Sequence, residues 1–409
     1  MDIYLVGGAV RDKLLGIEPK ERDWVVVGAH PQILEEQGFR AVGSDFPVFL
    51  HPESGEEYAL ARTERKSGHG YQGFTFHADA DVSLEQDLSR RDLTINAIAE
   101  DPQGQLIDPY GGQRDIANRC LRHVSDAFIE DPLRVLRVAR FAARFHHLGF
   151  SIAEETQQLM KTISHSGELE YLKPERIWRE TLLALSEGSP RTYIEVLRQC
   201  GALKILFPEL DKLFGVPQRA DFHPEVDTGI HLLMAMDQAT KLSDDPQVRF
   251  AVMVHDLGKG ITPESVLPRH IGHEEGGVPL VKDFCERLRV PNRFRHLALI
   301  VTRYHLLCHK ITTLRPKTVL KVLKGIDVFR QPKLLPCFLL ACKADARGRT
   351  GFEESDYPSE LWLQGIAHQV QQISTRELVE AGLKGGAIGE ALDEKRLQCI
   401  TEYKRQNTI

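Results

Sequence analysis

The sequence predicts an α+β fold, with a mixed-sheet head followed by helical domains. Short β-rich runs separated by Gly, Pro and Asp occupy the N-terminal part, at residues 3–6, 24–27, 48–50 and 57–61. After Glu130, apolar residues recur at spacings of three and four, which is the period of amphipathic helices. A chain of 409 residues with 42% hydrophobic residues is long enough to bury the cores of two to four domains.

Composition limits the class of protein. No apolar run reaches the roughly 18 residues of a membrane helix, and the N-terminus MDIYLVGG lacks the basic start of a signal peptide. We therefore expect a cytoplasmic protein with no membrane partner. The seven cysteines form no CxxC pair, which argues against a disulfide framework or a zinc knuckle.

The charge is unevenly distributed along the chain. The formal net charge is −6, yet residues 303–349 hold eleven Lys or Arg against two acids, Asp327 and Asp345. Phosphate binding depends on where the cations lie rather than on their total. This basic stretch is either a solvated helical face or a track for RNA.

Proline-containing stretches at residues 215–224 and 331–336 indicate boundaries between periodic segments. The predicted domains are a sheet-containing head over 1–125, a helical neck and body over 126–220, a histidine-rich helical domain over 221–330 and a helical tail over 331–409.

The first strand leads into a turn suited to anions. Residues 3–6 run into Gly7 and Gly8, and a helix over 9–16 follows at once. Glycines allow close backbone approach to a triphosphate, the start of the helix favours negative charge, and Arg11 adds a forked cation. A purely structural tight turn is the alternative, since the segment is neither a Walker A nor a GxGxxG loop.

Two acids precede the second strand. Glu21 and Asp23 are two residues apart, a spacing that places side chains on the same side of a strand. Their oxygens suit Mg²⁺, and two such ions can activate a 3′-hydroxyl while neutralising a leaving pyrophosphate. Glu56 or Glu57 could supply a third carboxylate. Solvated acids at a strand start are the alternative.

The segment RRDLTINA offers further candidate nucleotide contacts. Arg91 could bind phosphate or ribose, and Asp92 could accept a hydrogen bond from a ribose hydroxyl. A structural Arg–Asp salt bridge is the alternative for this pair.

The helix expected after Glu130 carries a charged face. Its charged residues are spaced by three, three, three and four: Asp131, Arg134, Arg137, Arg140 and Arg144. Four stacked cations repel one another, which favours triphosphate or RNA binding over a solvated face.

Asp131 and Arg134 can also read a base edge. One carboxylate beside one forked donor matches the exocyclic amine and unprotonated ring nitrogen of cytosine and adenine, whereas uracil and guanine present a carbonyl next to N–H.

These motifs, GGAVRD, the acidic pair, RRDLTINA and EDPLRVLRVARFAARF, resemble those of bacterial class II CCA-adding enzymes and poly(A) polymerases, in the same order. With the helical body and an HD domain, the resemblance covers essentially the whole chain and is closest to the multifunctional CCA-adding type. It implies a polymerase β-like nucleotidyltransferase head that uses Mg²⁺ to add and repair the 3′-terminal CCA of tRNA from CTP and ATP without a nucleic-acid template.

The resemblance also implies site residues and partners. The metal pair of this family is usually two aspartates, and here Glu21 stands first. The implied ligands and partners are tRNA, CTP and ATP, in a monomer or a homodimer. The residues implied to bind nucleotide are Gly8, Arg11, Arg91, Asp92, Asp131, Arg134, Arg137 and Arg140.

Eight of the seventeen histidines lie between His223 and His309. His255 and Asp256 end an apolar helix in RFAVMVHDLGKG and, with His231 upstream, resemble the HD phosphohydrolase pattern. Imidazole with carboxylate suits a transition metal such as Ni²⁺, Mn²⁺, Zn²⁺ or iron. His305 is the candidate closing ligand, since the acid that often completes such a site is not evident.

Such a metal would activate water against phosphate esters, and we expect phosphatase, 2′-nucleotidase and 2′,3′-cyclic phosphodiesterase activities. Lys259 could assist phosphate binding, whereas His223 and His296 are interpreted as structural. Two other functions stay open: a poly(A) polymerase, and an HD-domain phosphohydrolase or regulatory protein with an inactive head.

Overall fold

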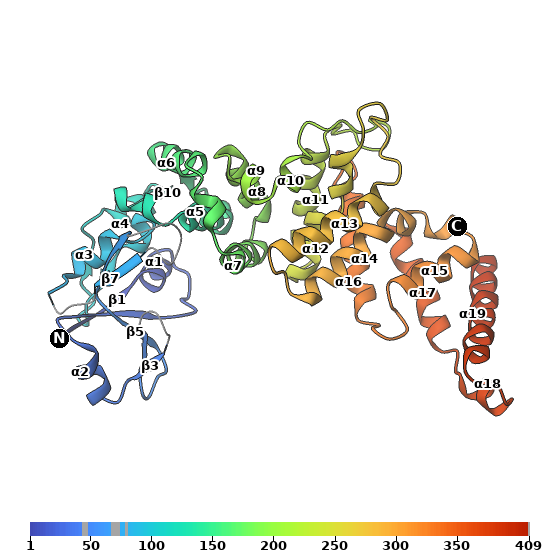
Figure 1. Cartoon of the computed structure of the whole chain (residues 1–409), viewed down its shortest axis with the longest axis horizontal. Coiled ribbons are helices and arrows are strands. Elements are labelled where there is room, and N and C mark those ends of the chain that lie inside the picture. Colours follow the sequence, from blue (N-terminus) through green and yellow to red (C-terminus); the bar gives the residue numbers. More distant parts are fainter. Residues whose placement is uncertain (43–47, 67–73, 78–80, 408–409) are drawn as a thin grey trace. The chain divides into compact units, whose positions relative to one another are not determined.

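The structure is a computed structural model that describes residues 1–42, 48–66, 74–77 and 81–407 (Figure 1). Its contacts divide the chain into two compact units, Met1–Leu206 and Phe207–Ile409, which are described separately below. Among the described residues, none of the helices combines the length and the apolar character needed to cross a membrane.

The first unit contains the mixed sheet that the sequence predicts, with strand order β3-β4-β5-β2-β1-β8-β9. Its strands are β1 Asp2–Val6, β2 Asp23–Val27, β3 Arg40–Val42, β4 Val48–Leu50, β5 Glu57–Leu60, β8 Ala99–Glu100 and β9 Leu106–Ile107. β2 and β5 pair in parallel with Asp23 opposite Glu57, and the other neighbours in this order pair antiparallel. A separate hairpin joins β6 Thr63–Lys66 to β7 Phe74–His77.

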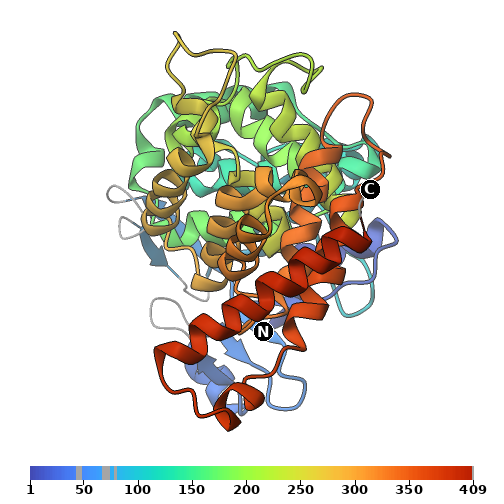
Figure 2. The same ribbon diagram turned by 90° about the vertical axis from the view of Figure 1, so that its right-hand side faces the viewer.

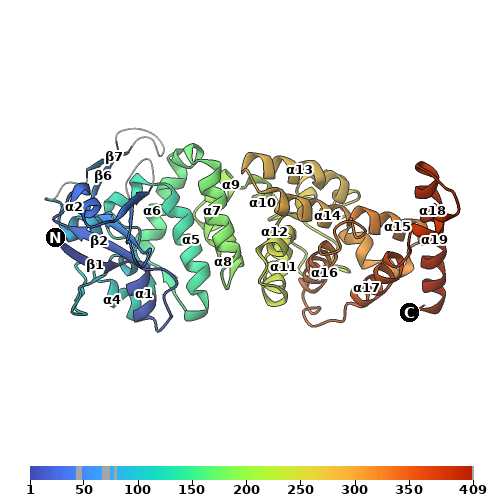
Figure 3. The ribbon, with the colours of Figure 1, turned by 90° about the horizontal axis from the view of Figure 1, so that it is seen from below.

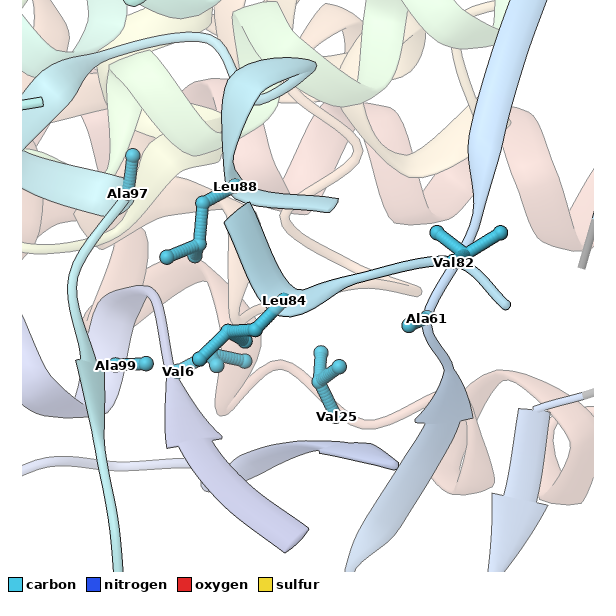
Figure 4. Packing of buried hydrophobic residues seen from close by; sticks show 8 residues of the cluster. All are labelled: Val6, Val25, Ala61, Val82, Leu84, Leu88, Ala97 and Ala99. Carbon is cyan, nitrogen blue, oxygen red and sulfur yellow. The ribbon is translucent and has the colours of Figure 1, made fainter. Parts of the chain in front are cut away.

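Both faces of strand β2 are covered. Successive side chains of a strand point to opposite faces of the sheet, so Val25 and Val26 pack on different sides. Val25 packs with Val6 and with Leu84 and Leu88 of α3, Leu84–Ser89, in the cluster drawn in Figure 4. Val26 packs on the other face beside α2, Pro31–Glu36. Asp23 lies two residues before Val25, so it projects on the α3 face of the sheet.

The other helices of this unit are α1 Gly8–Leu14, α4 Gly112–Ala117, α5 Leu133–Phe145, α6 Glu154–His165, α7 Pro174–Leu185, α8 Pro190–Gln199 and α9 Ala202–Leu206. α5 packs against α7 and α8, which run beside it in Figure 3. The helical periodicity of the sequence continues through residues 191–207, but the structure divides this run at Gly201, whose φ of 83° ends α8.

One short strand, β11 Ser151–Ile152, lies where the sequence predicts only helices. It pairs in parallel with β10, Cys120–Leu121. Two residues are too few to produce the alternation by which strands are recognised in a sequence.

The second unit is helical, as expected. Its helices are α10 Pro208–Asp211, α11 Thr228–Leu242, α12 Pro246–Val254, α13 His273–Arg287, α14 Asn292–His309, α15 Pro316–Gly325, α16 Leu334–Arg347, α17 Pro358–Gln371, α18 Arg376–Glu380 and α19 Gly386–Gln406. α11, α12, α14 and α16 pack on one another. α16 therefore joins this bundle although it follows residue 331, in the segment predicted to be a tail. α19, the long red helix in Figure 2, packs against α15 and α17.

Candidate functional site

The residues predicted to bind nucleotide and Mg²⁺ line one cavity of about 620 Å³ in the first unit. They are Gly8, Arg11, Glu21, Asp23, Arg91, Asp92, Asp131, Arg134, Arg137 and Arg140. The lining contains nine arginines and five carboxylates, an excess of four positive charges. This excess suits a polyanionic ligand.

The two glycines where β1 meets α1 are needed for different reasons: Gly7 precedes the helix and Gly8 is its first residue. Gly7 has a φ of 71°, and a Cβ there would lie 2.8 Å from Nη1 of Arg91. At Gly8, a Cβ would meet Nη2 of Arg11 at 3.5 Å, which is ordinary contact. Gly7 is therefore required by the turn, whereas the missing side chain of Gly8 leaves space beside the Arg11 guanidinium.

Arg11 is buried and held from several sides. Its Nε donates to Oδ1 of Asp12 at 2.8 Å, and its guanidinium lies over the rings of Phe141 and Phe145 at 5.1 and 5.2 Å. Burial lowers the pKa of Arg11, and the Asp12 carboxylate opposes this shift. Arg144 reaches the other oxygen of Asp12 at 2.8 Å, so one carboxylate fixes two arginines of the cavity.

One wall of the cavity carries carboxylates. Glu21 and Asp23 line it, and so does Glu57, because the parallel pairing places Glu57 opposite Asp23. Burial raises the pKa of Asp23; the nearby Glu21 carboxylate raises it further, and Arg91 opposes both. Glu56 instead accepts a 2.9 Å hydrogen bond from Nε1 of Trp24. Of the two residues considered for a third carboxylate, the structure places Glu57 at the cavity, and the three acids fit a hard cation.

Asp92 is a buried counterion. Its Oδ2 accepts from Nε of Arg137 at 2.7 Å, and its Oδ1 accepts from the Leu93 amide and from Nδ2 of Asn96, both at 2.8 Å. Burial raises the pKa of Asp92, but Arg137 and Asn96 together hold it well below its ordinary value. Asp92 therefore forms its salt bridge with Arg137 rather than with Arg91, which instead pairs with Oδ2 of Asp87 at 3.2 Å. Contact with ribose stays a prediction.

The arginines of α5 are matched by acceptors from other elements, so the expectation of repulsion between unmatched cations is wrong. Nε of Arg140 lies 2.7 Å from Oε2 of Glu180 on α7, and Arg144 pairs with Asp12 on α1. Arg134 donates to the main-chain carbonyls of Ala127, at 2.9 Å, and Arg90. These acceptors come from other elements, and the periodicity of one helix cannot reveal them.

Asp131 lies where α5 begins. Its Oδ1 accepts from the Leu133 amide at 3.1 Å, and its Oδ2 pairs with Nη2 of Arg176 at 3.0 Å. Asp131 and Arg134 both line the cavity and make separate hydrogen bonds. Arg176, on α7, also lines the cavity and was not predicted from the sequence, where it is one cation of an amphipathic helix.

The second unit gathers a buried cluster of histidines and aspartates. It contains His231 of α11, His255 and Asp256 after α12, His305 of α14, and two residues not predicted as ligands, His273 of α13 and Asp345 of α16.

Asp345 is the acid that was not evident from the sequence. Its Oδ1 lies 3.0 Å from Nε2 of His231 and 3.5 Å from Nε2 of His255. The sequence held one signal for it, since Asp345 is one of two acids in the basic stretch over residues 303–349. Some cations of that stretch pair locally, as Lys343 does with Glu360 at 2.8 Å.

The four buried histidines share one orientation. Nδ1 faces a main-chain carbonyl in each, at distances of 2.7 to 3.0 Å: His231 faces Gly348, His255 faces Val252, His273 faces His270 and His305 faces Val301. A carbonyl only accepts, so Nδ1 carries the hydrogen and Nε2 points into the cluster as a potential ligand. This donor set fits a transition metal better than Ca²⁺.

The carboxylates of the cluster attract a cation. Burial lowers the pKa of His255, but Asp256 and Asp345 reverse the shift and raise it to about 10. Burial lowers the pKa of His305 to about 3, so this ring is neutral at physiological pH.

A cavity of about 560 Å³ opens onto the cluster, with His273, His305 and Asp345 in its lining. The lining also includes cations and aromatic rings: Arg219, Lys259, Arg269, Lys310, Arg349, Phe222 and Tyr357. His223 also lines it, 3.0 Å from Oε1 of Glu225, whereas His296 is exposed. Nζ of Lys259 lies 2.7 Å from Oδ2 of Asp256 and donates to Gln218.

Comparison with known proteins places three family models on the chain. A poly A polymerase head domain matches residues 3–122, a probable RNA and SrmB- binding site of polymerase A matches residues 149–214, and an HD domain matches residues 228–329. A multifunctional CCA protein of Thioalkalivibrio sulfidiphilus (strain HL-EbGR7) is 57% identical over 406 residues, which cover 99% of each chain.

Solved structures give the same picture of the fold. A CCA-adding enzyme with CTP has a TM-score of 0.66 and 24% identity, over 98% of this chain and 87% of that chain. The Thermotoga maritima CCA-adding enzyme complexed with tRNA_CCA has a TM-score of 0.64 and 22% identity, over 99% and 91% of the two chains. These likenesses establish a shared fold.

Proposed function

Since the chain belongs to the multifunctional CCA protein family, as its motifs predicted, we propose that it adds and repairs the 3′-terminal CCA of tRNA from CTP and ATP without a nucleic-acid template. The observation that carries this proposal is the single cavity in which the nucleotide-binding and acidic candidates meet. Its arginines would hold the triphosphate, and the carboxylate wall of Glu21, Asp23 and Glu57 would face the reacting end of the tRNA.

In the proposed reaction, the tRNA 3′-hydroxyl oxygen forms a bond to the α-phosphorus, the α–β bridging bond breaks, and pyrophosphate leaves. Glu21 and Asp23 would hold Mg²⁺, which would lower the cost of both the attacking and the leaving negative charge. Arg137 and Arg140 have fixed positions because buried acids hold them, and pre-oriented cations stabilise charge without reorganising.

Base choice is proposed to rest on Asp131 and Arg134. The carboxylate would accept from the exocyclic amine that cytosine and adenine carry, and the guanidinium would face the ring nitrogen. Two main-chain carbonyls hold Arg134, so its direction depends on the backbone rather than on a flexible neighbour. A template of this kind rejects uracil and guanine because their carbonyl would meet the Asp131 carboxylate.

For the second unit, we propose a metal-dependent phosphohydrolase with phosphatase, 2′-nucleotidase and 2′,3′-cyclic phosphodiesterase activities. His231, His255, Asp256 and His305 would hold a transition metal such as Ni²⁺, together with Asp345. The bound metal would supply an activated water, whose oxygen would form a bond to phosphorus as the ester P–O bond breaks and the leaving oxygen takes a proton. Cationic and aromatic residues of the cavity suit a nucleoside phosphate at an RNA end.

One experiment tests the transferase and its alternatives. The protein is incubated with tRNA lacking its 3′ end and with CTP, ATP, UTP or GTP singly and in combination. A CCA-adding enzyme extends the tRNA by C residues with CTP and completes the end only when ATP is also present. Addition of A alone would support a poly(A) polymerase, and no addition would support an HD protein with an inactive head.

A further inference from the structure

We propose that the cavity of the second unit binds a nucleobase at its rim, formed by Phe222 and Ile271, with the base stacked on the Phe222 ring. The phosphate of the same ligand would reach the histidine cluster. The ligand class is a nucleoside phosphate, supplied either as a free nucleotide or as the end of an RNA chain. This proposal deepens the phosphohydrolase function proposed above and rests on it for the chemistry at the phosphate.

Phe222 is an exposed aromatic side chain in the lining of the cavity. It keeps 54% of its surface exposed. The guanidinium of Arg219 lies 4.7 Å from the centre of its ring and covers only part of it. Apolar surface that is left open to water at a cavity is typical of a place where a ligand binds. A base stacked on the Phe222 ring would remove this surface from water.

A second exposed apolar side chain lines the same cavity. Ile271, in the loop before α13, is 81% exposed. Its loop contacts the loop that carries Phe222, because Nε2 of His270 donates to the main-chain carbonyl of Pro217 at 3.2 Å. Every base has an apolar face that can cover such side chains. A phosphate ester without a base would leave both of them in water.

The main chain of Phe222 is held in place relative to the histidine cluster. The next residue, His223, packs its ring on that of His231, with the ring centres 4.7 Å apart. On the other side, Nη1 of Arg349 donates to the Phe222 carbonyl at 3.3 Å. Arg349 follows Gly348, whose carbonyl faces Nδ1 of His231 at 2.9 Å. The positions for base and phosphate therefore belong to one connected structure, which a single nucleotide can occupy.

The charge of the cavity suits more than one phosphate. Apart from histidines, its lining holds five Lys or Arg against two Asp, an excess of three positive charges. Two of these lining cations, Arg269 and Lys310, form no ion pair with an acid of the described part of the chain. A phosphomonoester dianion uses two of the three charges, and the next phosphate of an RNA chain would use the third. We therefore expect an RNA end to bind more tightly than a free nucleotide.

Hydrolysis of two phosphate esters of secondary alcohols by the full-length protein tests the base site. Adenosine 2′-monophosphate carries a base, and glycerol 2-phosphate does not. Phe222→Ala and Phe222→Leu should lower the ratio of kcat/KM for the first ester over the second by about fivefold to 150-fold, the effect of one lost base-stacking contact. Phe222→Tyr keeps the ring and should keep the ratio. The matched control is Phe352→Ala, which removes an exposed ring that lies 4.4 Å from the Arg349 guanidinium and does not line the cavity.

A binding measurement without turnover separates this proposal from the function on which it rests. The fluorescence of 2-aminopurine falls when this base stacks on an aromatic ring. The probes are 2-aminopurine riboside 2′-monophosphate and a short RNA that ends in the same nucleotide. We expect the wild type and Phe222→Tyr to quench both probes, and Phe222→Leu to bind both at least about fivefold more weakly.

The outcomes are distinct. Equal binding by the wild type and Phe222→Leu, or a wild-type ratio of kcat/KM in a folded Phe222→Ala, would overturn the base site. Equal affinity of the wild type for the two probes, with weaker binding by Phe222→Leu, would support the base site and identify free nucleotides as its ligand. Quenching that depends on Phe222, without hydrolysis of either ester, would support the base site and refute the phosphohydrolase.

Discussion

Substitution of Asp131 by alanine should loosen base selection before it affects nucleotidyl transfer. The carboxylate lies at the cavity, and we propose that it accepts from the amine of an incoming cytosine or adenine. A charge-assisted hydrogen bond of this kind contributes about 1.5 to 3 kcal/mol. Its loss corresponds to a roughly tenfold to 150-fold change in the ratio of kcat/KM for CTP over UTP, and for ATP over GTP.

The same substitution has a separate cost in stability. Asp131 accepts a hydrogen bond from the Leu133 amide at 3.1 Å at the start of α5, and a side-chain hydrogen bond at the start of a helix is worth about 1 kcal/mol. The ion pair with Arg176 is partly exposed, at 25% and 20% for the two side chains, and adds about 1 kcal/mol or less. A loss of about 1 to 2 kcal/mol leaves a domain folded.

Steady-state kinetics with each of the four nucleotides, together with thermal unfolding, separate the two effects. Arg176→Ala is the control, because it removes the ion pair and leaves the Asp131 carboxylate in place. We expect Arg176→Ala to keep the rejection of UTP and GTP. If Asp131→Ala rejected these two nucleotides as well as the wild type does, the proposed template would be refuted.

Asp23→Ala should abolish the addition of both C and A while the circular dichroism spectrum stays unchanged. Glu21→Asp should keep Mg²⁺-dependent transfer, whereas Glu21→Ala should lose it. Full activity of Glu21→Ala would show that this glutamate is not a metal ligand. His255→Ala should lose divalent-metal-dependent phosphatase activity while CCA addition on the same preparation stays near normal; equal loss of both activities would indicate one shared site. Gly258→Ala should destabilise the second unit by about 1 to 3 kcal/mol, because its Cβ would lie 2.0 Å from a main-chain carbonyl of α13, and an unchanged melting temperature would contradict this. The folded-state pKa of Asp92 lies below its ordinary value, so the stabilisation that Asp92 gives the head is present at neutral pH and is lost as the pH falls below about 4. Asp92→Asn should therefore flatten the acid part of the curve of unfolding free energy against pH. An unchanged curve would assign the acid sensitivity to other groups.

Much of the fold could be predicted because it depends on local patterns. The strands at residues 3–6, 24–27, 48–50 and 57–61 are present, since β-rich composition and flanking turn residues are properties of neighbouring positions. The division at Gly201 was not predicted, because an isolated glycine is tolerated within a helical pattern.

The site was harder to predict where it depends on distant contacts. Asp345 lies 114 residues from His231, and its one signal in the sequence is that it is an acid within a basic stretch, so the packing of α11 on α16 is needed to reveal its role. Asp92 and Glu180 were not predicted as counterions of the α5 arginines for the same reason. Glu57 rather than Glu56 lies at the cavity because of the register between β2 and β5. The sequence of either strand alone does not determine this register.

The contact between His231 and the Gly348 carbonyl ties the proposed metal binding to folding. The two residues are 117 positions apart, so the histidine takes its orientation only after the helices between them have packed. An unfolded chain therefore offers no comparable site, and ligands that bind only the folded state stabilise it by mass action. At a free metal concentration a hundred times the Kd, one ion would add about 2.7 kcal/mol to the unfolding free energy. Metal supply in the cell would then set how long the second unit persists against proteolysis.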